Sequence, residues 1–363
     1  MKIYIILPRF HTNYSDIIQN LLDQGHQIKL FVYNFGKIEN YRYIKPRLIR
    51  ENFFTKFINN FFKIKQNKFY LPSLKEFKKE IIDTSPDVVI MRPYSKLFTL
   101  LILISNFISD FKTILYHQTD FEKLGKFNFS TKYFKFFLIS KIFKMRSYSP
   151  LFNNRKKLPF KELYFLPFAK QINLKKKKYN TKNNFLMIGK FIKKKNHEMF
   201  IRGIKYLTTK YEVKATIIGE VSTREHKIEL DRIKKLINRL NLKNIIKIKT
   251  NIKNNKIMNY YYRNDFFVLP TTHDPAPISI IEALSMGCMV LCSSSCGTKN
   301  YIKVKLNGFI FKNNDQKSLN QCLIKLIKNK KFFFKNFNQN KKYLLKTIGN
   351  NNFNKHFYKL IKY

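Results

Sequence analysis

Short apolar runs alternate with longer amphipathic stretches along the first half of the chain. Each run covers four or five residues, too few for a helix, and its apolar character suits a strand covered on both faces. A helical pattern over Asp16–Leu22 joins the first two runs, and Gly25 marks the turn after it. The runs are Ile3–Leu7, Ile28–Val32, Val88–Met91 and Thr113–Tyr116. This alternation predicts parallel strands with helical crossovers.

The same alternation resumes after a polar, basic break at Lys170–Asn184, which we interpret as a linker. The strands expected beyond it are Phe185–Gly189, Val213–Gly219, Ile245–Ile248, Phe266–Leu269, Met289–Cys292 and Phe309–Phe311. A chain of 363 residues is long enough for two separate cores. We therefore predict an α/β protein with two doubly wound, Rossmann-like domains facing a central cleft, where ligands of such folds bind.

The expected domain boundaries follow from the break and from the end of the alternation. Residues 1–169 form the N-terminal domain, 170–184 the linker, 185–340 the C-terminal domain and 341–363 a C-terminal helical segment. The last part, from Phe332 to Tyr363, is rich in Lys, Asn and Phe. Its pattern predicts one or two amphipathic helices with a break near Gly349.

Composition adds a strongly basic surface to this picture. The formal net charge is +49, and the apolar content of 44% excludes a disordered chain. Lys, Asn, Ile and Phe are abundant and Trp is absent, a pattern that an AT-rich genome produces as readily as selection for charge. Such a surface attracts anionic lipid, nucleic acid or polyphosphate. We favour a generally basic surface over a dedicated nucleic-acid site.

Membrane association is the next question that the apolar and basic residues raise. The longest apolar stretch, Leu97–Phe107, is too short to span a bilayer, and the N-terminus MKIYIILPRF predicts a strand and no signal peptide. The basic aromatic stretches Phe53–Phe69 and Tyr133–Lys144 allow two interpretations. They could rest on an anionic bilayer, or form ordinary amphipathic helices packed on the sheet, which we slightly favour. We expect a cytoplasmic protein, peripheral at most on the inner face of the membrane.

The four cysteines are Cys288, Cys292, Cys296 and Cys322, and the first three are spaced by four residues. A metal site would need a second group of ligands at a matching spacing. Cys288 and Cys292 instead bracket an expected strand, so we interpret the cysteines as small core residues in a reduced protein. We expect no metal and no other cofactor.

The stretch from Asp265 to Ala283, DFFVLPTTHDPAPISIIEA, carries the most informative chemistry. The apolar strand ends at Pro270, and Pro277 is well placed in the first turn of a helix that follows. Asp274 lies in the loop between them, and Glu282 follows eight residues later inside the helix. The first amides of a helix have no intrahelical partner and attract anions. This layout suits a sugar whose leaving group is a phosphate, although an ordinary strand, loop and helix with two solvated acids remains open on this segment alone.

Two motifs, in matching order and spacing, give the second half a family resemblance. IGKFIKKKNHEMFI, from Ile188 to Ile201, and HDPAPISIIEALSMG resemble the nucleotide-sugar-binding domain of retaining family 4 glycosyltransferases, which have the GT-B fold. The IIGE sequence that contains Gly219 is similar to the middle strand of that domain. The resemblance covers roughly residues 184 to 330. The first half matches the family only in general layout.

The resemblance implies roles for individual residues. Lys190 and Lys195 would hold the diphosphate of the donor with the amides near Ile278, Asp274 would face the donor sugar, and Glu282 would bind the ribose hydroxyls. We therefore expect catalytic roles for Asp274, Lys190 and Lys195, and donor binding by Gly189, Glu282, Ile278 and Gly219. The family often has a His that contacts the donor sugar near the place of His117, which follows an expected strand of the first half, so the resemblance makes His117 a candidate for that contact, with a core or loop histidine as the alternative. The run Lys193–Lys195 offers three candidates for one cation.

Several positions depart from the family pattern. Lys190 stands in place of the usual Arg, so a point charge replaces a bidentate phosphate contact. Asp274 is one methylene shorter than the usual Glu. The N-terminal loop PRFHTNYSD lacks the family's glycines, so a phosphate can approach that backbone less freely.

The function that the resemblance implies is transfer of a sugar, with retention, from a nucleoside diphosphate sugar to a saccharide or lipid-linked acceptor. The pathway would be lipopolysaccharide or surface polysaccharide synthesis, with an anionic membrane surface as a further partner and no specific nucleic acid. Two alternatives stay open: another GT-B enzyme such as a nucleotide-sugar epimerase, and a basic, non-enzymatic binder of membrane or nucleic acid. A glycosidase use of Asp274 and Glu282 is less favoured, because a diphosphate leaves without strong protonation.

Overall fold

The structure is a computed structural model in which the chain forms two compact units. The first unit comprises Met1–Ala169 together with Asn352–Tyr363, and the second comprises Lys170–Asn351. The structure describes residues 1–10, 13–35, 41, 43–62, 70–93, 95–118, 138, 141–143, 145–151, 163–172, 174 and 182–362. Much of the expected linker and most of the stretch Tyr133–Lys144 lie outside these residues.

The N-terminal unit is built on a parallel sheet with the strand order β3-β2-β1-β4-β5-β6-β7. All four runs predicted in this half are strands of the sheet, within one residue at their ends. Three further strands escaped prediction because they are short, and one of them, RSYS at Arg146–Ser149, has no apolar run. The strands are β1 (Lys2–Leu7), β2 (Gln27–Val32), β3 (Arg47–Leu48), β4 (Val88–Met91), β5 (Lys112–Tyr116), β6 (Arg146–Ser149) and β7 (Leu163–Phe165).

Helices bury their apolar faces on both sides of this sheet. One core joins β1 and β2 to α1 (Asn13–Asp23) and α14 (Asn350–Ile361), and the other joins the opposite face to α4 (Lys96–Ile108). The remaining helices of this unit are α2 (Phe53–Phe61), α3 (Leu74–Phe77) and the π-helix η1 (Lys78–Ile82). No helix within the described part of the chain is long and apolar enough to cross a membrane.

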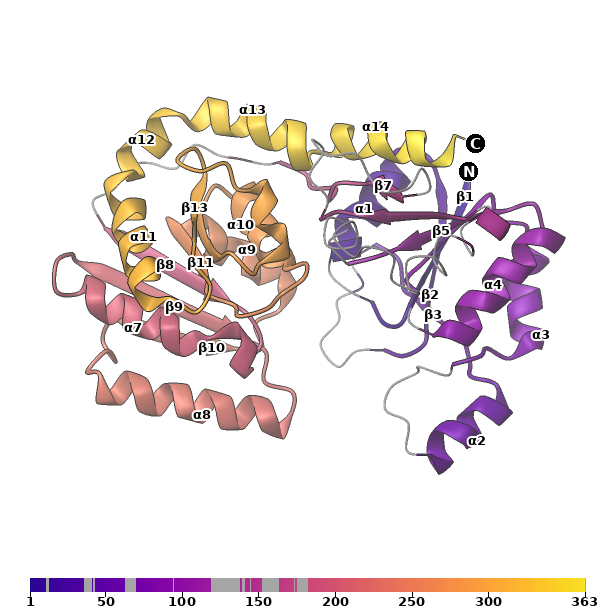
Figure 1. Ribbon diagram of the computed structural model, residues 1–363, viewed down its shortest axis with the longest axis horizontal. Helices are drawn as coiled ribbons and strands as arrows, with labels where there is room; N and C mark the ends of the chain where they lie inside the picture. The colour runs from indigo at the N-terminus through magenta and orange to yellow at the C-terminus, as the bar shows by residue number, and fades with distance from the viewer. Residues whose placement is uncertain are drawn as a thin grey trace. The chain divides into compact units, whose positions relative to one another are not determined.

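The C-terminal unit repeats the plan with a parallel sheet in the order β10-β9-β8-β11-β12-β13 (Figure 1). All six runs predicted here are strands, and the largest core packs one face of the sheet against α7, α8 and α11. The strands are β8 (Asn183–Ile188), β9 (Val213–Gly219), β10 (Ile246–Thr250), β11 (Phe266–Leu269), β12 (Met289–Ser293) and β13 (Gly308–Phe311). The helices are η2 (Lys193–Lys195, 3-10), α7 (His197–Leu207), α8 (Arg224–Arg239), α9 (Asn254–Arg263), α10 (Ile278–Ser285), η3 (Gly297–Tyr301, 3-10), α11 (Gln316–Lys328), α12 (Lys330–Lys335) and α13 (Phe337–Ile348).

The C-terminal segment, expected as one piece at 341–363, is divided between the two units. Gly349 ends α13 as predicted, with an extended backbone at φ −68° and ψ 152°. The chain then returns to the N-terminal unit as α14 (Figure 1). This helix packs four apolar side chains into the core that contains β1. These side chains are Phe353, Phe357, Leu360 and Ile361.

Candidate functional site

The strand order of the C-terminal sheet reverses between β8 and β11. From β8 the chain moves outward to β9 and β10, and it then crosses to β11 and continues through β12 to β13. In open α/β sheets, ligands bind at such a switch point, beyond the carboxyl ends of the strands. Gly189 and Lys190 follow β8 there, and the loop with Asp274 follows β11. The two motifs that are 79 residues apart at Lys195 and Asp274 thus meet at one place.

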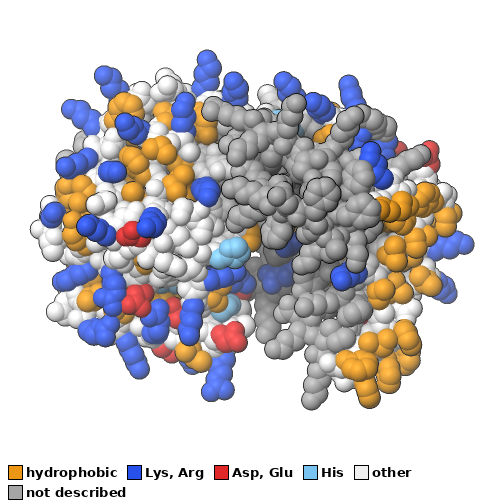
Figure 2. All heavy atoms as spheres, in the orientation of Figure 1, with side chains coloured by type: hydrophobic (Ala, Val, Ile, Leu, Met, Phe, Trp, Pro, Cys, Tyr) orange, Lys and Arg blue, Asp and Glu red, His pale blue; other side chains and the backbone are white. Residues whose placement is uncertain are grey.

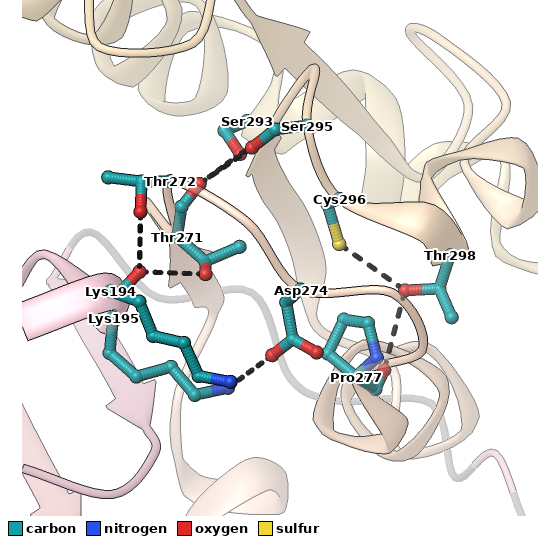
Figure 3. Close-up of polar contacts among 10 residues, drawn as sticks. All are labelled: Lys194, Lys195, Thr271, Thr272, Asp274, Pro277, Ser293, Ser295, Cys296 and Thr298. Atoms are coloured by element: carbon teal, nitrogen blue, oxygen red, sulfur yellow. Dashed lines mark hydrogen bonds and ion pairs between the residues drawn. The ribbon is translucent and has the colours of Figure 1, made fainter. Parts of the chain in front are cut away.

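The loop after β8 reaches the loop after β11 through backbone and side-chain contacts (Figure 3). The carbonyl oxygen of Lys194 accepts hydrogen bonds from the Thr271 hydroxyl and from the Thr272 amide, both at 2.9 Å. The Lys195 ammonium forms an ion pair with the Asp274 carboxylate. The contacts of the Lys194 carbonyl hold the two loops together, and the ion pair is a further link between the same loops.

The Lys195–Asp274 pair is shielded from water but still reachable. The side chains of Lys195 and Asp274 are 13% and 14% exposed. An ammonium carries three N–H donors, so the pair with one carboxylate leaves donors for a second anion. Lys193 and Lys194 are exposed, and Lys195 is the lysine of this run that pairs with Asp274.

Asp274 is held by the chain on its other side as well. Its carbonyl oxygen accepts a hydrogen bond from the Gly297 amide at 2.9 Å, and its backbone pairs with that of Cys296. The loop upstream is fastened at the Thr271 carbonyl, which accepts from the hydroxyls of Ser293 at 2.5 Å and Ser295 at 2.9 Å. Since the loop is fixed from β12 as well as from β8, the carboxylate is preorganised.

Lys190 lies at the same edge with a different carboxylate as partner. Its ammonium contacts Glu220 at 3.0 Å, with the two side chains 40% and 27% exposed. Glu220, which directly follows β9, also accepts a hydrogen bond from the Ser222 hydroxyl at 2.6 Å. Lys190 is therefore the more accessible of the two expected cations. Nothing in the residue pattern pairs it with Glu220.

Glu282 is buried in α10 and only 6% exposed. Its carboxylate accepts a hydrogen bond of 2.9 Å from the hydroxyl of Tyr261, a fully buried residue of α9. Burial is the main cause, and the nearby Glu282 charge the second, of a Tyr261 pKa well above its ordinary value. The phenol therefore stays protonated and acts as the hydrogen-bond donor. The Cys288 thiol donates in turn to the Tyr261 carbonyl at 3.0 Å. Tyr261 was not predicted, because the sequence NYYYRND offers three tyrosines with no sign of which one faces α10.

The two expected glycines make room for these loops. A methyl group at Gly219 would lie 2.4 Å from a ring carbon of Phe191 and 2.6 Å from the Gly189 carbonyl oxygen. One at Gly189 would press on the Lys195 side chain at 3.2 Å. Phe191 is fully buried and stacks on His197 with ring centroids 5.1 Å apart. Gly219 is thus required for the close approach of the β8 and β9 loop ends.

α10 begins at Ile278, which is half-buried beside Pro277. The Thr298 hydroxyl donates to the Pro277 carbonyl at 3.3 Å, and this contact fixes the start of the helix behind Asp274 (Figure 3). The helix stops at Ser285, and Gly287 adopts a left-handed φ of 76°, the conformation in which a glycine commonly ends a helix.

Three histidines occupy different environments. His117 belongs to the N-terminal unit, just beyond β5, so it is not among the residues that the C-terminal unit brings together. Its ring lies 3.2 Å from the Ser147 hydroxyl, and burial lowers its pKa to about 4. Burial, then the Lys195 and Arg232 charges, lower the pKa of His197 to about 3. His273, which precedes Asp274, is exposed.

The cysteines are core residues, as predicted. Cys288, Cys292, Cys296 and Cys322 are all free and buried. Among the described residues, no three His, Cys, Asp or Glu side chains gather as a metal site would require.

Comparison with known proteins gives a family for the C-terminal unit. Residues 169–347 match the family described as Glycosyl transferases group 1. A curated relative, the UDP-Gal:alpha-D-GlcNAc-diphosphoundecaprenol alpha-1,3-galactosyltransferase of Escherichia coli, is 26% identical over 204 residues. That alignment covers 50% of this chain and 51% of the relative, so the chain spans about half the length of the curated relative.

Solved structures agree over nearly the full chain. A glycosyltransferase from Rickettsia africae has a TM-score of 0.70 at 14% identity and covers 99% of both chains. The lipopolysaccharide outer core galactosyltransferase WaaB, in its apo form, has a TM-score of 0.66 at 15% identity with the same coverage. At these identities the likeness shows a common fold. Over residues 169–347 the chain therefore matches the glycosyl transferases group 1, and its two units of parallel sheet and helices have the GT-B fold of the glycosyltransferases that it resembles.

Proposed function

We propose that this chain transfers a hexose from a UDP-sugar to a hydroxyl of a lipid-linked or saccharide acceptor, with retention of the anomeric configuration. The single observation that carries this proposal is the Lys195–Asp274 pair, which places a cation and a carboxylate together at the switch point of the sheet. A donor of this class needs both charges, since its diphosphate leaves as an anion while its sugar must be held in place.

The roles of the residues follow from their positions. Lys195, Lys190 and the first amides of α10 receive the negative charge that grows on the departing diphosphate. Preorganised charge of this kind commonly contributes more to catalysis than any other single effect, because the groups need not reorganise during the reaction. Asp274 faces the sugar, and Glu282, oriented by Tyr261, accepts hydrogen bonds from the ribose hydroxyls. Lys190 is an exposed point charge, so it attracts the diphosphate but does little to orient it.

The donor and acceptor classes rest on the curated relative. Its name couples UDP-galactose with a lipid-linked GlcNAc diphosphate acceptor. We assign the same classes to this chain, and with them a step in the synthesis of surface polysaccharide or lipopolysaccharide at the inner face of the membrane. No specific nucleic-acid partner belongs to this function.

Calorimetric titration with UDP, GDP, ADP and inorganic pyrophosphate tests the donor site. A salt concentration of about 0.3 M screens nonspecific attraction to the basic surface. We expect a clear preference for UDP that Glu282→Ala abolishes and the matched control Glu225→Ala preserves, because Glu225 is an exposed residue at the start of α8. Equal, weak binding of all four ligands would refute a donor site.

A transfer assay separates the proposal from its alternatives. With UDP-galactose and a lipid-diphosphate-linked GlcNAc acceptor, we expect a disaccharide product with an α linkage, seen by NMR at the new anomeric centre. Conversion of the UDP-sugar to its epimer without acceptor would indicate an epimerase instead. A β-linked product would contradict retention while leaving the transferase function intact.

A further inference from the structure

The helix α2 turns its polar side toward the protein and its aromatic side toward solvent. Asn52 caps its start by accepting a hydrogen bond from the Phe54 amide at 2.8 Å. Thr55 is the only buried residue of the helix, and its hydroxyl donates to the Asn52 carbonyl at 3.2 Å. One turn later, the Asn59 amide donates to Glu51 at 2.6 Å. These contacts fix the rotation of the helix about its axis.

The opposite side of α2 is a row of exposed phenylalanines. Their exposed fractions are 84% for Phe53, 68% for Phe54, 59% for Phe57, 70% for Phe61 and 66% for Phe62. Phe53, Phe57 and Phe61 are spaced by four, so they line one face of the helix. Of the two interpretations that the sequence left open for this stretch, packing on the sheet is wrong for α2. Residues 63–69 of the same stretch lie outside the described part of the chain.

The helix α4 adds a second exposed apolar row. Its other face packs Phe98, Ile102 and Leu103 into the core. The exposed row consists of Leu97, Leu100, Ile104, Phe107 and Ile108, of which Ile108 is 81% exposed. The ring centroids of Phe107 and Phe143 lie 5.4 Å apart, and Ile142, which precedes Phe143 in the chain, is exposed. Figure 2 shows hydrophobic side chains gathered over α4 and α2 on one edge of the N-terminal unit.

Charge selects the partner of this apolar surface. Neither α2 nor α4 contains an acidic residue, whereas Lys56 and Lys96 are exposed on these helices. A soluble monomer seldom exposes so many large apolar side chains together. Aromatic rings bordered by lysines, on a chain of net charge +49, match the interface of an anionic bilayer, where rings enter the headgroup region and ammonium groups meet lipid phosphates.

We propose that the phenylalanine face of α2 and the exposed row of α4 form one surface that inserts into the headgroup region of an anionic bilayer. This surface belongs to the N-terminal unit and contains none of the residues assigned to the donor. It would hold the enzyme beside an acceptor that is itself anchored in the membrane. In that respect the inference rests on the proposed function, although bilayer binding is measured without donor or acceptor.

Flotation with vesicles tests the proposal on the full chain. We expect binding to vesicles of about 30% phosphatidylglycerol in phosphatidylcholine, and a loss of roughly tenfold or more in the triple variant Phe53→Ser, Phe57→Ser, Phe61→Ser. The matched control is Ile228→Ser, Phe332→Ser, Leu345→Ser, which removes three side chains of the C-terminal unit that are 60%, 48% and 46% exposed. Equal binding by both triple variants would overturn the proposal.

A fluorescent probe reports insertion directly, because the chain contains no Trp. We expect Phe57→Trp to show a blue-shifted emission on adding anionic vesicles, while Phe332→Trp stays unchanged. An unshifted Phe57→Trp in vesicle-bound protein would show that only surface charge binds lipid, and would overturn insertion.

Two further measurements keep the outcomes distinct. Urea denaturation of the Phe53, Phe57, Phe61 triple variant should match that of the parent chain, which shows that the variant is folded. Light scattering without vesicles should show the same mass for both. A parent dimer that the triple variant makes monomeric would assign the surface to a second copy of the chain and refute the bilayer.

Discussion

The two units share one plan, a parallel sheet with helices on both faces, but they differ in what their side chains offer. In the C-terminal unit, charged residues at the strand ends are paired and fastened by neighbouring loops, as with Lys195 and Asp274. In the N-terminal unit, Tyr14, Tyr116 and Tyr148 pack ring against ring at 5.3 and 5.0 Å near the ends of the strands. Its most unusual feature lies outside, on α2 and α4. Under the functions proposed above, the C-terminal unit performs the chemistry and the N-terminal unit binds the membrane, although both units have the same plan.

The largest effect expected from this contrast is on catalysis by the C-terminal unit. We predict that Lys195→Ala lowers turnover by about two to three orders of magnitude, because a preorganised cation for the diphosphate is lost. The control is Lys194→Ala, which retains the Lys194 carbonyl that binds Thr271 and Thr272. Steady-state transfer rates with saturating donor measure both. Similar rates for the two variants would remove the catalytic role from this edge of the sheet.

A second prediction concerns the close approach of the loops in the C-terminal unit. Gly219→Ala should lower the free energy of unfolding by about 1–3 kcal/mol, because the new methyl group overlaps the Phe191 ring and the Gly189 carbonyl. Gly25→Ala is a useful counterpart in the N-terminal unit, since open space surrounds that position and only its φ of 76° opposes the change. Urea denaturation compares them. If Gly219→Ala changes neither the free energy of unfolding nor the affinity for UDP, the loops accommodate the methyl group without strain.

Tyr261 should act only through Glu282. We predict that Tyr261→Phe weakens UDP binding by about fivefold, the worth of roughly 1 kcal/mol for one hydrogen bond, because the carboxylate loses the donor that orients it. Tyr262→Phe, at an exposed neighbour, should leave UDP affinity unchanged. If Tyr261→Phe weakens UDP binding no further in a Glu282→Gln background, then Tyr261 acts on UDP binding through Glu282. If the losses of UDP affinity from the two substitutions add, the two residues act independently.

The smallest effect expected is on the pH dependence of stability, where each unit has a histidine whose pKa is lowered chiefly by burial. The pKa values of His117 and His197 are about 4 and about 3, below the ordinary 6.5. As the pH falls from about 6.5 toward these lower pKa values, the unfolded chain binds more protons than the folded chain. The free energy of unfolding therefore declines over this pH range. Replacing His197 with Phe should flatten the decline by at most about 1.4 kcal/mol per pH unit. His273→Phe, in an exposed loop, should change nothing in the same denaturation series.

Several parts of the fold and site were accessible from residue patterns, and others were not. Apolar runs such as Phe266–Leu269 identify buried strands because both faces of a parallel strand are covered. The two-residue β3 at the sheet edge, with both residues exposed, carries no such signal. Asp274 and Glu282 were proposed as site residues from their spacing after a strand. Glu220 and Tyr261 were missed, because their partners are distant in sequence and a single polar residue predicts no partner.

The sequence by itself determined the α/β class, the positions of the main strands, and the motif residues that we propose as the donor site. These depend on local periodicity and on short spacings, which the chain displays wherever it folds. The tertiary structure alone decided that Lys195, and neither of its two neighbours, reaches Asp274, and that α14 returns to complete the first core. It also decided that the phenylalanines of α2 face outward, since an amphipathic pattern gives a helix two faces but does not say which one meets the protein.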